Sequence, residues 1–215
     1  MKDEIKVFDK GYVKLRDVFG NDLTVVNAAR VSYDKQVNEL TPQDKQFIKN
    51  LVVRGETSPF RHCVLTFEIK APLFVARQWW RYSVASAVRE EMFGWNEKSL
   101  RYTEEYDFYI PEYLDSHCCV EYLNSCMYAM ETYDYLITSG VKKETARGVL
   151  PASVYTRWIW TPSLQTVIHF LRERLDRTKT QYETYCYASA VCQLTNRYFS
   201  VSLQHSLPNL EMALA

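Results

Sequence analysis

Residues 77–102 hold an unusual concentration of arginine and aromatic side chains. Arg77, Arg81 and Arg101 are interspersed with three tryptophans, two tyrosines and the carboxylate of Glu97. A guanidinium presents a planar set of donors that suits phosphate, and aromatic rings stack on bases and flat cofactors. The stretch therefore predicts a site for a planar, anionic ligand such as a nucleotide. The alternative is an amphipathic helix with buried tryptophans and surface arginines.

The elements around this stretch predict an α+β fold in a single domain over residues 1–215. Alternating apolar residues predict strands within 5–19, with a break at Lys10-Gly11, and over Cys63–Lys70 and Val154–Trp160. Apolar periodicity and end signals predict helices from Asp22 (as the cap) to Val31, Thr41 to Val53, Pro72 to Arg81, Val120 to Ser139, Lys143 to Leu150, Ser163 to Leu175 and Thr180 to Phe199. Because strands and helices do not alternate regularly, α+β is favoured over α/β.

Composition narrows the class of ligand. The chain has 215 residues, 47% hydrophobic and 24% charged, with a formal net charge of zero. A general nucleic-acid binder is usually basic, so a polynucleotide partner is disfavoured. Only six glycines occur, and none forms the Gly-x-Gly spacing of dinucleotide or P-loop motifs. Phosphate must therefore be bound by side chains or helix N-termini.

Neither a metal site nor a membrane segment is expected. The six cysteines contain no Cys-x-x-Cys pair, and His117-Cys118-Cys119 lacks a second ligand cluster. No apolar run approaches the length of a membrane span, and the N-terminus has no signal-peptide pattern. We therefore expect a cytoplasmic protein without a metal ion.

A second candidate site lies in the helix predicted over 163–175. On a helical wheel, Arg174 falls on the shoulder of the apolar arc, where a cation needs an anion or a polar ligand unless it snorkels to water. Gln165 and His169 lie one turn apart on the other shoulder, and Ser163 is the probable N-cap. A helix N-terminus attracts phosphate.

The motifs resemble those of the flavin-dependent thymidylate synthases. "FVARQWWR" (74–81) and "WNEKSLRY" (95–102) are similar to the two halves of that family's Arg-His-Arg and Ser-x-Arg motif. Tyr82 and Ser83 stand where the family has His and Arg, and Ala87–Gly94 resembles an insertion between the halves. Further similar segments, in the family's order, are "GYVKLRDVFGNDLTVVNAARVSYD", "ETSPFRHCVLTFEIKAP", "TARGVLPASVYTRWIW" and "FLRERLDR".

The resemblance implies a small, mostly antiparallel sheet packed by several helices, and a homotetramer whose sites lie between subunits. Arg174 would be the catalytic residue that favours ionisation of the uracil ring. The dUMP contacts implied are Gln78, Arg81, Glu97, Lys98, Ser99, Leu100, Arg101, Arg147 and Arg174. The FAD contacts implied are Ser58, Arg81, Tyr82, Ser83, Glu97, Ser163, Gln165 and His169. Arg61 stands where the family commonly has an acid, and is expected to replace phosphate-binding charge lost at Ser83 and Gln165.

The function implied is reductive methylation of dUMP to dTMP. Methylenetetrahydrofolate would donate the carbon, and FAD reduced by NADPH would supply the hydride. One alternative keeps the fold and methylates another pyrimidine nucleotide, such as UMP, because the 87–94 insertion reshapes the pocket. The other is a non-catalytic nucleotide-binding oligomer that has lost its flavin, as the departures at Tyr82 and Ser83 suggest.

Overall fold

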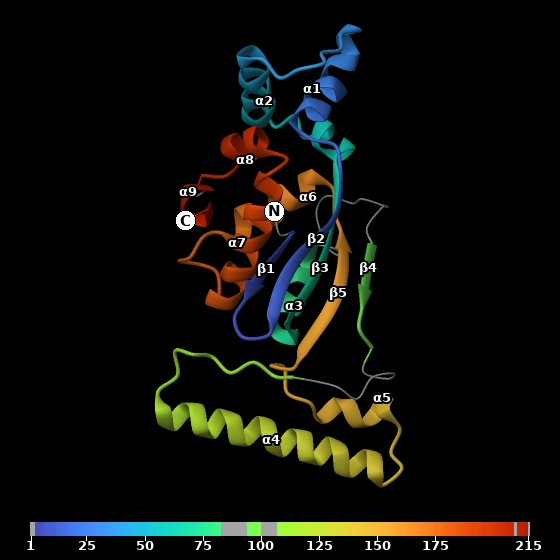
Figure 1. The fold of residues 1–215 in the computed structure, drawn as a ribbon, viewed down its shortest axis with the longest axis vertical. Coiled ribbons are helices and arrows are strands. Elements are labelled where there is room, and N and C mark those ends of the chain that lie inside the picture. Colours follow the sequence, from blue (N-terminus) through green and yellow to red (C-terminus); the bar gives the residue numbers. More distant parts are fainter. Residues whose placement is uncertain (1–2, 83–93, 100–106, 209, 215) are drawn as a thin grey trace.

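A computed structural model describes residues 3–82, 94–99, 107–208 and 210–214. Within these residues one antiparallel sheet of five strands has the order β1-β2-β3-β5-β4 (Figure 1). The strands are β1 (Glu4–Val7), β2 (Gly11–Phe19), β3 (Val64–Pro72), β4 (Gly94–Glu97) and β5 (Tyr155–Thr161). The α+β prediction and the antiparallel sheet are confirmed.

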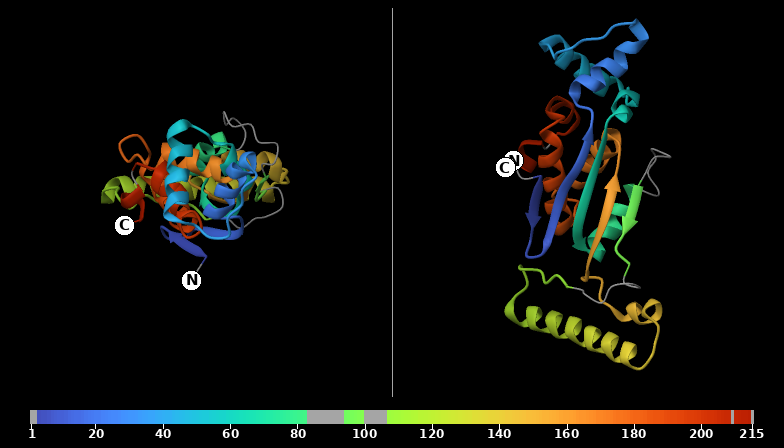
Figure 2. Two further views of the ribbon diagram at one scale, coloured as in Figure 1. Left: turned by 90° about the horizontal axis from the view of Figure 1, so that it is seen from above. Right: turned by 45° about the vertical axis from the view of Figure 1, so that its right-hand side comes forward.

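The helices cover one face of this sheet and extend beyond both of its ends. They are α1 (Asp22–Arg30), α2 (Pro42–Arg54), α3 (Leu73–Trp79), α4 (Ser116–Thr138), α5 (Lys143–Ala146), α6 (Leu164–Arg174), α7 (Tyr182–Asn196), α8 (Ser200–Ser206) and α9 (Leu210–Leu214). Short 3₁₀ turns occupy Val31–Tyr33, Ser58–His62, Trp80–Tyr82 and Arg147–Val149. Figures 1 and 2 show α1 and α2 at one end of the molecule and α4 and α5 at the other.

The core lies between one face of the sheet and the helices α3, α6 and α7. Side chains alternate along β3, so Leu65, Phe67 and Ile69 are buried against the helices while Glu68 and Lys70 project from the opposite face. Figure 2 shows the helices gathered on one side of the strands. The other face, over the part of the chain that the structure describes, carries mostly polar side chains.

Aromatic rings fill the core where α3 crosses the sheet. Trp79 is fully buried and lies edge-on to Trp158 at 5.4 Å and to Trp160 at 5.3 Å, with Phe170 stacked on it at 4.4 Å between ring centroids. Such edge and stacked contacts add stability beyond the burial of area. Trp79 therefore belongs to the core, whereas Trp80, the next residue, borders the candidate site.

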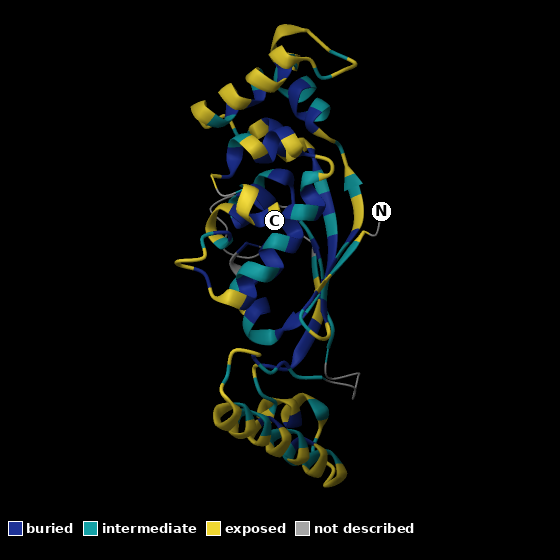
Figure 3. Ribbon diagram, turned by 60° about the vertical axis from the view of Figure 1, so that its left-hand side comes forward, coloured by how far each residue is buried: buried dark blue, intermediate teal, exposed yellow. Residues whose placement is uncertain are grey.

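Helix α4 contributes little to the core. Of its residues only Cys126 and Tyr133 are buried, and the exposed surface of the helix is conspicuous in Figure 3. The exposed side chains include four large apolar or aromatic ones, namely Val120, Met127, Tyr128 and Tyr135. In the described chain no helix, α4 included, combines the length and hydropathy that a membrane span requires.

The start of α1 differs from the prediction. Asn21, not Asp22, caps α1 by accepting hydrogen bonds from Leu23 and Thr24. The carboxylate of Asp22 instead accepts hydrogen bonds from the backbone amides of Val201 and Ser202, both at 2.9 Å. This cap of α8 is buried, and burial raises the pKa of Asp22 even though these hydrogen bonds act to lower it.

The ends of two other segments also differ. Helix α4 begins at Ser116, before the predicted Val120, because Asp115 accepts a hydrogen bond from the amide of Cys118 and so caps it. Helix α7 ends at Asn196, and α8 and α9 follow it, where a single closing helix to Phe199 was predicted. The turn before α8, at Phe199, ends the helix that was predicted to continue and lets α8 fold back toward α1 and α2.

Candidate functional site

A hollow lies where α3, β4, β5 and the α5 segment meet. Its volume is about 590 Å³. It is lined by Leu73, Arg77, Trp80, Glu97, Lys98, Ser99, Glu144, Arg147, Gly148, Leu150, Pro151, Val154, Tyr155 and Thr156. We call it the α3–β5 hollow. Four predicted nucleotide contacts, Glu97, Lys98, Ser99 and Arg147, thus come together although some fifty residues separate them in sequence.

Two arginines add positive charge to this hollow, whose lining also includes the acids Glu97 and Glu144. Arg77 comes from α3 and Arg147 from the 3₁₀ turn after α5. Neither guanidinium has an ion pair or hydrogen bond within the residues that the structure describes. A guanidinium without an acid partner keeps its full capacity to bind phosphate.

The acid in the hollow has a fixed position. Thr156 donates a hydrogen bond from its hydroxyl to the carboxylate of Glu97 at 2.6 Å. Glu97 is at the end of β4, which pairs with β5 so that Glu97 lies opposite Trp158. A carboxylate held in this way can accept a hydrogen bond from a ligand hydroxyl.

One wall of the hollow is aromatic and apolar. Trp80 lies edge-on to Trp95 at 6.2 Å between ring centroids, and Trp95 in turn stacks on Trp158 at 5.0 Å. Tyr155 also lines the hollow; its hydroxyl donates to Asp9 at 2.7 Å, and burial with this hydrogen bond raises its pKa. The hollow therefore combines a ring-binding wall with cationic and hydroxyl-binding groups, as a nucleotide requires.

A second group of predicted residues lies on α6, apart from this hollow. The guanidinium carbon of Arg174 is 5.4 Å from the centroid of the Tyr82 ring, and His169 lies 5.4 Å from the same ring. Tyr82 is only 5% exposed and also packs edge-on against Phe170 at 5.1 Å. The Nε atom of Arg174 is buried without a hydrogen bond to any described residue. A buried guanidinium nitrogen without a partner is a candidate for contact with a ligand.

A third group lies near the start of α6. Arg61 donates from Nε to the side-chain oxygen of Gln165 at 2.6 Å, and Gln165 donates to the hydroxyl of Thr57 at 3.1 Å. The hydroxyl of Ser163 accepts from the amide of Thr166 as the cap of α6. Ser58 lines a separate hollow of about 310 Å³ between α1, α2 and the 3₁₀ turn that follows α2.

The remaining predicted contacts have other positions. Gln78 donates to the side-chain oxygen of Gln181, at the start of α7, at 2.6 Å. The side chain of Arg81 and all of Ser83, Leu100 and Arg101 lie outside the described residues, as does most of the 87–94 insertion. The candidate residues that the structure describes therefore form three groups within one chain, and the α3–β5 hollow contains only one of these groups.

Sequence analysis placed Arg77 and Trp80 in the arginine- and tryptophan-rich stretch but assigned neither a ligand contact, and it did not single out Glu144. Arg77 precedes Arg81 by one helical turn, and that spacing was a usable signal. Trp80 and Glu144 had no such sequence signal, because an indole and an acid are common on any helix. Their place depends on how the α5 segment folds back over α3, which is a tertiary effect.

Comparisons with known proteins agree with this architecture. A family profile described as "Thymidylate synthase complementing protein" matches residues 14–199. The flavin-dependent thymidylate synthase of Thermotoga neapolitana is 38% identical over 200 residues, which cover 89% of this chain and 88% of that relative. That of Ehrlichia ruminantium (strain Gardel) is 35% identical over 218 residues, which cover 91% of this chain and 70% of that relative.

A solved structure is also similar. The UMP/dUMP methylase PolB from Streptomyces cacaoi, bound with 5-Br dUMP, has a TM-score of 0.79 and 27% sequence identity, over 94% of this chain and 96% of that one. The profile match and the identity over most of the chain show the family, and the similar structure shows the fold. The chain therefore belongs to the family of flavin-dependent thymidylate synthases.

Proposed function

We propose that this protein methylates C5 of dUMP, with methylenetetrahydrofolate as carbon donor, FAD as the hydride carrier and NADPH as reductant. The observation that carries the proposal is the α3–β5 hollow, which unites two unpaired guanidiniums, an oriented carboxylate and an indole wall. Arg77 and Arg147 would bind the phosphate, Glu97 and Ser99 the sugar hydroxyl, and Trp80 the side of the ring. The curated relatives are named for the same reaction.

Arg174 would act on the pyrimidine. A guanidinium remains charged at any physiological pH and stabilises negative charge that develops on a uracil ring. Its contact with the ring of Tyr82 and the burial of its Nε fix its position before a substrate arrives. This arrangement needs no nucleophile from the protein.

The residues near α6 fit a flavin dinucleotide. Arg61 is held at Nε by a neutral amide, so its charge is not cancelled and its two terminal nitrogens remain for a phosphate. Ser58, Gln165 and His169 would add hydroxyl, amide and imidazole contacts. The bound flavin would supply the hydride, which no protein side chain can donate.

Arg174 and the α3–β5 hollow belong to different regions of one chain, so a complete site needs more than one copy. We therefore infer a homotetramer in which one copy's hollow meets another copy's α6. Isologous contacts between identical surfaces are the usual route to such closed assemblies.

A second substrate has specific support. The similar structure is described as a UMP/dUMP methylase, and it is also known bound with 5-Br UMP. The difference between the two nucleotides is the 2′-hydroxyl, and a carboxylate such as Glu97 can accept a hydrogen bond from it. Measuring kcat/KM for dUMP and for UMP under the same conditions decides between them.

The visible absorbance spectrum of the purified protein tests the proposal directly. We expect bound FAD, and a shift of its bands when dUMP is added, because the two ligands would share one site. If saturating FAD leaves no bound flavin while dUMP still binds, the synthase proposal fails and the chain is a non-catalytic nucleotide-binding oligomer.

A further inference from the structure

A second, smaller hollow adjoins the α3–β5 hollow on the open face of the sheet. Its volume is about 280 Å³, and it shares Lys98, Tyr155 and Thr156 with its neighbour. The rest of its lining is Tyr12, Lys70, Asp107 and Arg157. We call it the open-face hollow. The two hollows are contiguous, so a ligand in one lies next to the contents of the other.

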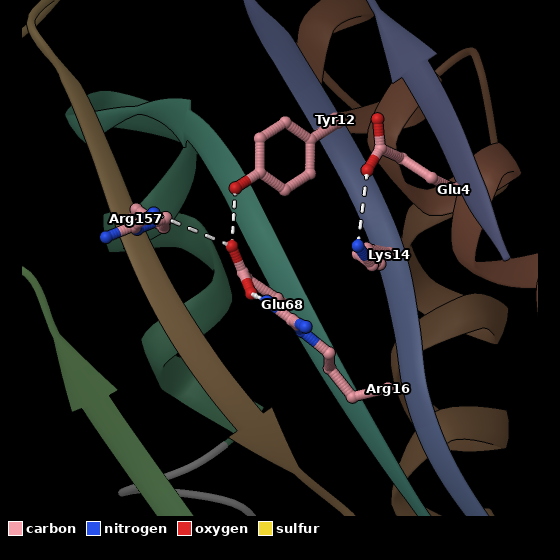
Figure 4. Close-up of polar contacts among 6 residues, drawn as sticks. All are labelled: Glu4, Tyr12, Lys14, Arg16, Glu68 and Arg157. Atoms are coloured by element: carbon pink, nitrogen blue, oxygen red, sulfur yellow. Dashed lines mark hydrogen bonds and ion pairs between the residues drawn. The ribbon is translucent and has the colours of Figure 1, made fainter.

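Glu68 on this face has more cationic partners than it needs. Arg16 binds the carboxylate through Nε at 2.7 Å and also through a terminal nitrogen, and Tyr12 donates to it at 2.5 Å (Figure 4). Arg157 lies farther away, with Nη1 3.8 Å from the same carboxylate, and its side chain is 57% exposed. Arg16 and Tyr12 thus satisfy Glu68 by themselves, and the charge of Arg157 is in surplus.

Asp107, which also lines the hollow, likewise has two cationic partners. Lys10 donates to one of its oxygens at 2.7 Å and Lys70 to the other at 3.1 Å. The ammonium of Lys70 is also 5.4 Å from the centroid of the Tyr155 ring, which fixes it at the rim. Lys10 alone can neutralise Asp107, so Lys70 supplies a second surplus charge.

One further acid has to be counted. Asp9 accepts a hydrogen bond from the Tyr155 hydroxyl at 2.7 Å and adds favourable charge beside Lys10. Across the described residues of this region, five cations (Lys10, Arg16, Lys70, Lys98 and Arg157) then face three acids (Asp9, Glu68 and Asp107). Asp9 lies on the Lys10 side, whereas Lys70 and Arg157 line the hollow itself. The concave surface is therefore positive although the whole chain is neutral.

We propose that the open-face hollow is a phosphate-binding subsite in which Lys70 and Arg157 hold the ligand. Lys70 on β3 and Arg157 on β5 are paired across neighbouring strands, and two adjacent cations in a small hollow match one dianionic group. The phosphate is either the free ion or the 2′-phosphate of the reduced nicotinamide co-substrate, which would reach the subsite from beside the nucleotide. Only this second source rests on the proposed function; the subsite itself does not.

Titration with inorganic phosphate, followed by ³¹P NMR line broadening, tests the subsite. A background that carries both Arg77→Ala and Arg147→Ala removes the two phosphate ligands assigned to the neighbouring hollow, so the signal reports the open-face hollow whether or not dUMP is a substrate. We expect Arg157→Ala and Lys70→Ala each to weaken phosphate binding by about three- to tenfold, as loss of one exposed cation implies. Lys14→Ala is the matched control, because Lys14 lies on the same face but pairs with Glu4 at 3.8 Å.

The surplus also predicts which variants remain stable. Arg157→Ala leaves Glu68 with Arg16 and Tyr12, so thermal unfolding should stay close to that of the parent protein, whereas Arg16→Ala should lower the midpoint. Phosphate binding that is equal in the parent, Arg157→Ala and Lys70→Ala proteins overturns the proposal. Equal losses in Lys14→Ala also overturn it, because they indicate a diffuse field in place of a site.

Kinetics identify the source of the phosphate. If Arg157→Ala raises KM for NADPH three- to tenfold and leaves KM for NADH unchanged, the subsite binds the 2′-phosphate of the co-substrate. If both KM values are unchanged while phosphate binding is lost in the NMR titration, the ligand is the free ion. An inactive parent protein contradicts the proposed function and leaves the NMR test of the subsite intact.

Discussion

Arg174 keeps a buried Nε without a described partner while its guanidinium packs on an aromatic ring. A lysine at this position would keep the charge and lose the planar set of donors. We expect Arg174→Lys to lower kcat by about 100-fold, the range seen when an electrostatic contact to the transition state is removed. Steady-state kinetics with dUMP measure this.

Arg177→Ala is the control for that substitution. Arg177 is three residues farther along the chain, in the turn after α6, and also packs on a ring, that of Tyr185 at 5.2 Å, but it is exposed and belongs to no candidate group. Its kcat should match that of the parent protein. A full kcat in Arg174→Lys with normal folding contradicts a role for the guanidinium in the chemical step.

The hydroxyl of Thr156 orients the carboxylate of Glu97. Thr156→Val keeps the shape of the side chain and removes this hydrogen bond, at a cost of about 1 kcal/mol, which corresponds to about a fivefold change in binding. We expect KM for dUMP to rise by about that factor with little change in kcat. Thr161 lies on the same strand as Thr156, and among the described residues its hydroxyl contacts only Thr66 of β3, at 3.4 Å. Thr161→Val should therefore leave KM unchanged.

Helix α2 shows how local sequence defines an element. The hydroxyl of Thr41 accepts from the amide of Asp44, and Asp44 accepts from the amide of Thr41 at 2.8 Å. Arg30 lies 2.5 Å from the other oxygen of Asp44, a close charge contact without the angle of a hydrogen bond. Burial acts to raise the pKa of Asp44, but the Thr41 hydrogen bonds and the charge of Arg30 outweigh it and lower the pKa.

The direction of this shift predicts a pH dependence of stability. Because the pKa is lower in the folded protein than in the unfolded chain, the stabilisation is present above the unfolded pKa and is lost as pH falls through the folded value. Asp44→Asn should therefore lower the free energy of unfolding by about 1–2 kcal/mol at pH 7. In urea titrations the difference from the parent protein should shrink below pH 4, and a constant difference would contradict the assignment.

The cap of α2 could be predicted because both partners lie within four residues of each other. The cap of α1 could not, since Asn21 and Asp22 are equally good caps locally and Asp22 is used by α8 near the other end of the chain. β4 was also missed, because four residues containing one tryptophan make no strand pattern, and only pairing with β5 makes them extended.

The candidate site, like the fold, could be predicted from the sequence only in part. Family resemblance pointed to Glu97, Ser99 and Arg147, but their meeting in one hollow depends on how the α5 segment packs and follows from no sequence spacing. Arg77 was named in the arginine- and tryptophan-rich stretch, but no contact was assigned to it from the sequence. Sequence analysis could not identify Lys70 and Arg157, the two surplus cations of the open-face hollow. The pairing of β2, β3 and β5 determines which acid lies beside each cation.

At the scale of the whole molecule, α4 presents aromatic side chains to solvent. Tyr128 is 73% exposed and Tyr135 70%, on a helix that is mostly exposed (Figure 3). Exposed patches of this kind commonly mark contacts between proteins. We expect light scattering to give a mass near four times the 25.3 kDa of one chain, with α4 in the contact.

Tyr128→Asp with Tyr135→Asp should then produce smaller particles, because charge is costly to bury in an apolar contact. Val53→Asp, at an equally exposed apolar position on α2, is the control and should keep the parent mass. A parent protein that is monomeric at micromolar concentration contradicts the assembly and the shared sites that depend on it.

The hydrogen bonds from Val201 and Ser202 to Asp22 also affect how the chain acquires its structure. They join residues 179 and 180 positions apart, and α2 packs on the same helix α8 at that end of the molecule (Figure 1). During synthesis α1 and α2 are made early, but the amides that donate to Asp22 and the surface of α8 on which α2 packs appear only when residue 202 has left the ribosome. Contacts this distant in sequence slow folding. The α1–α2 end therefore cannot pack on α8 until synthesis is almost complete, and until then Asp22 stays hydrated. Chaperones have the longest access to this end of the molecule.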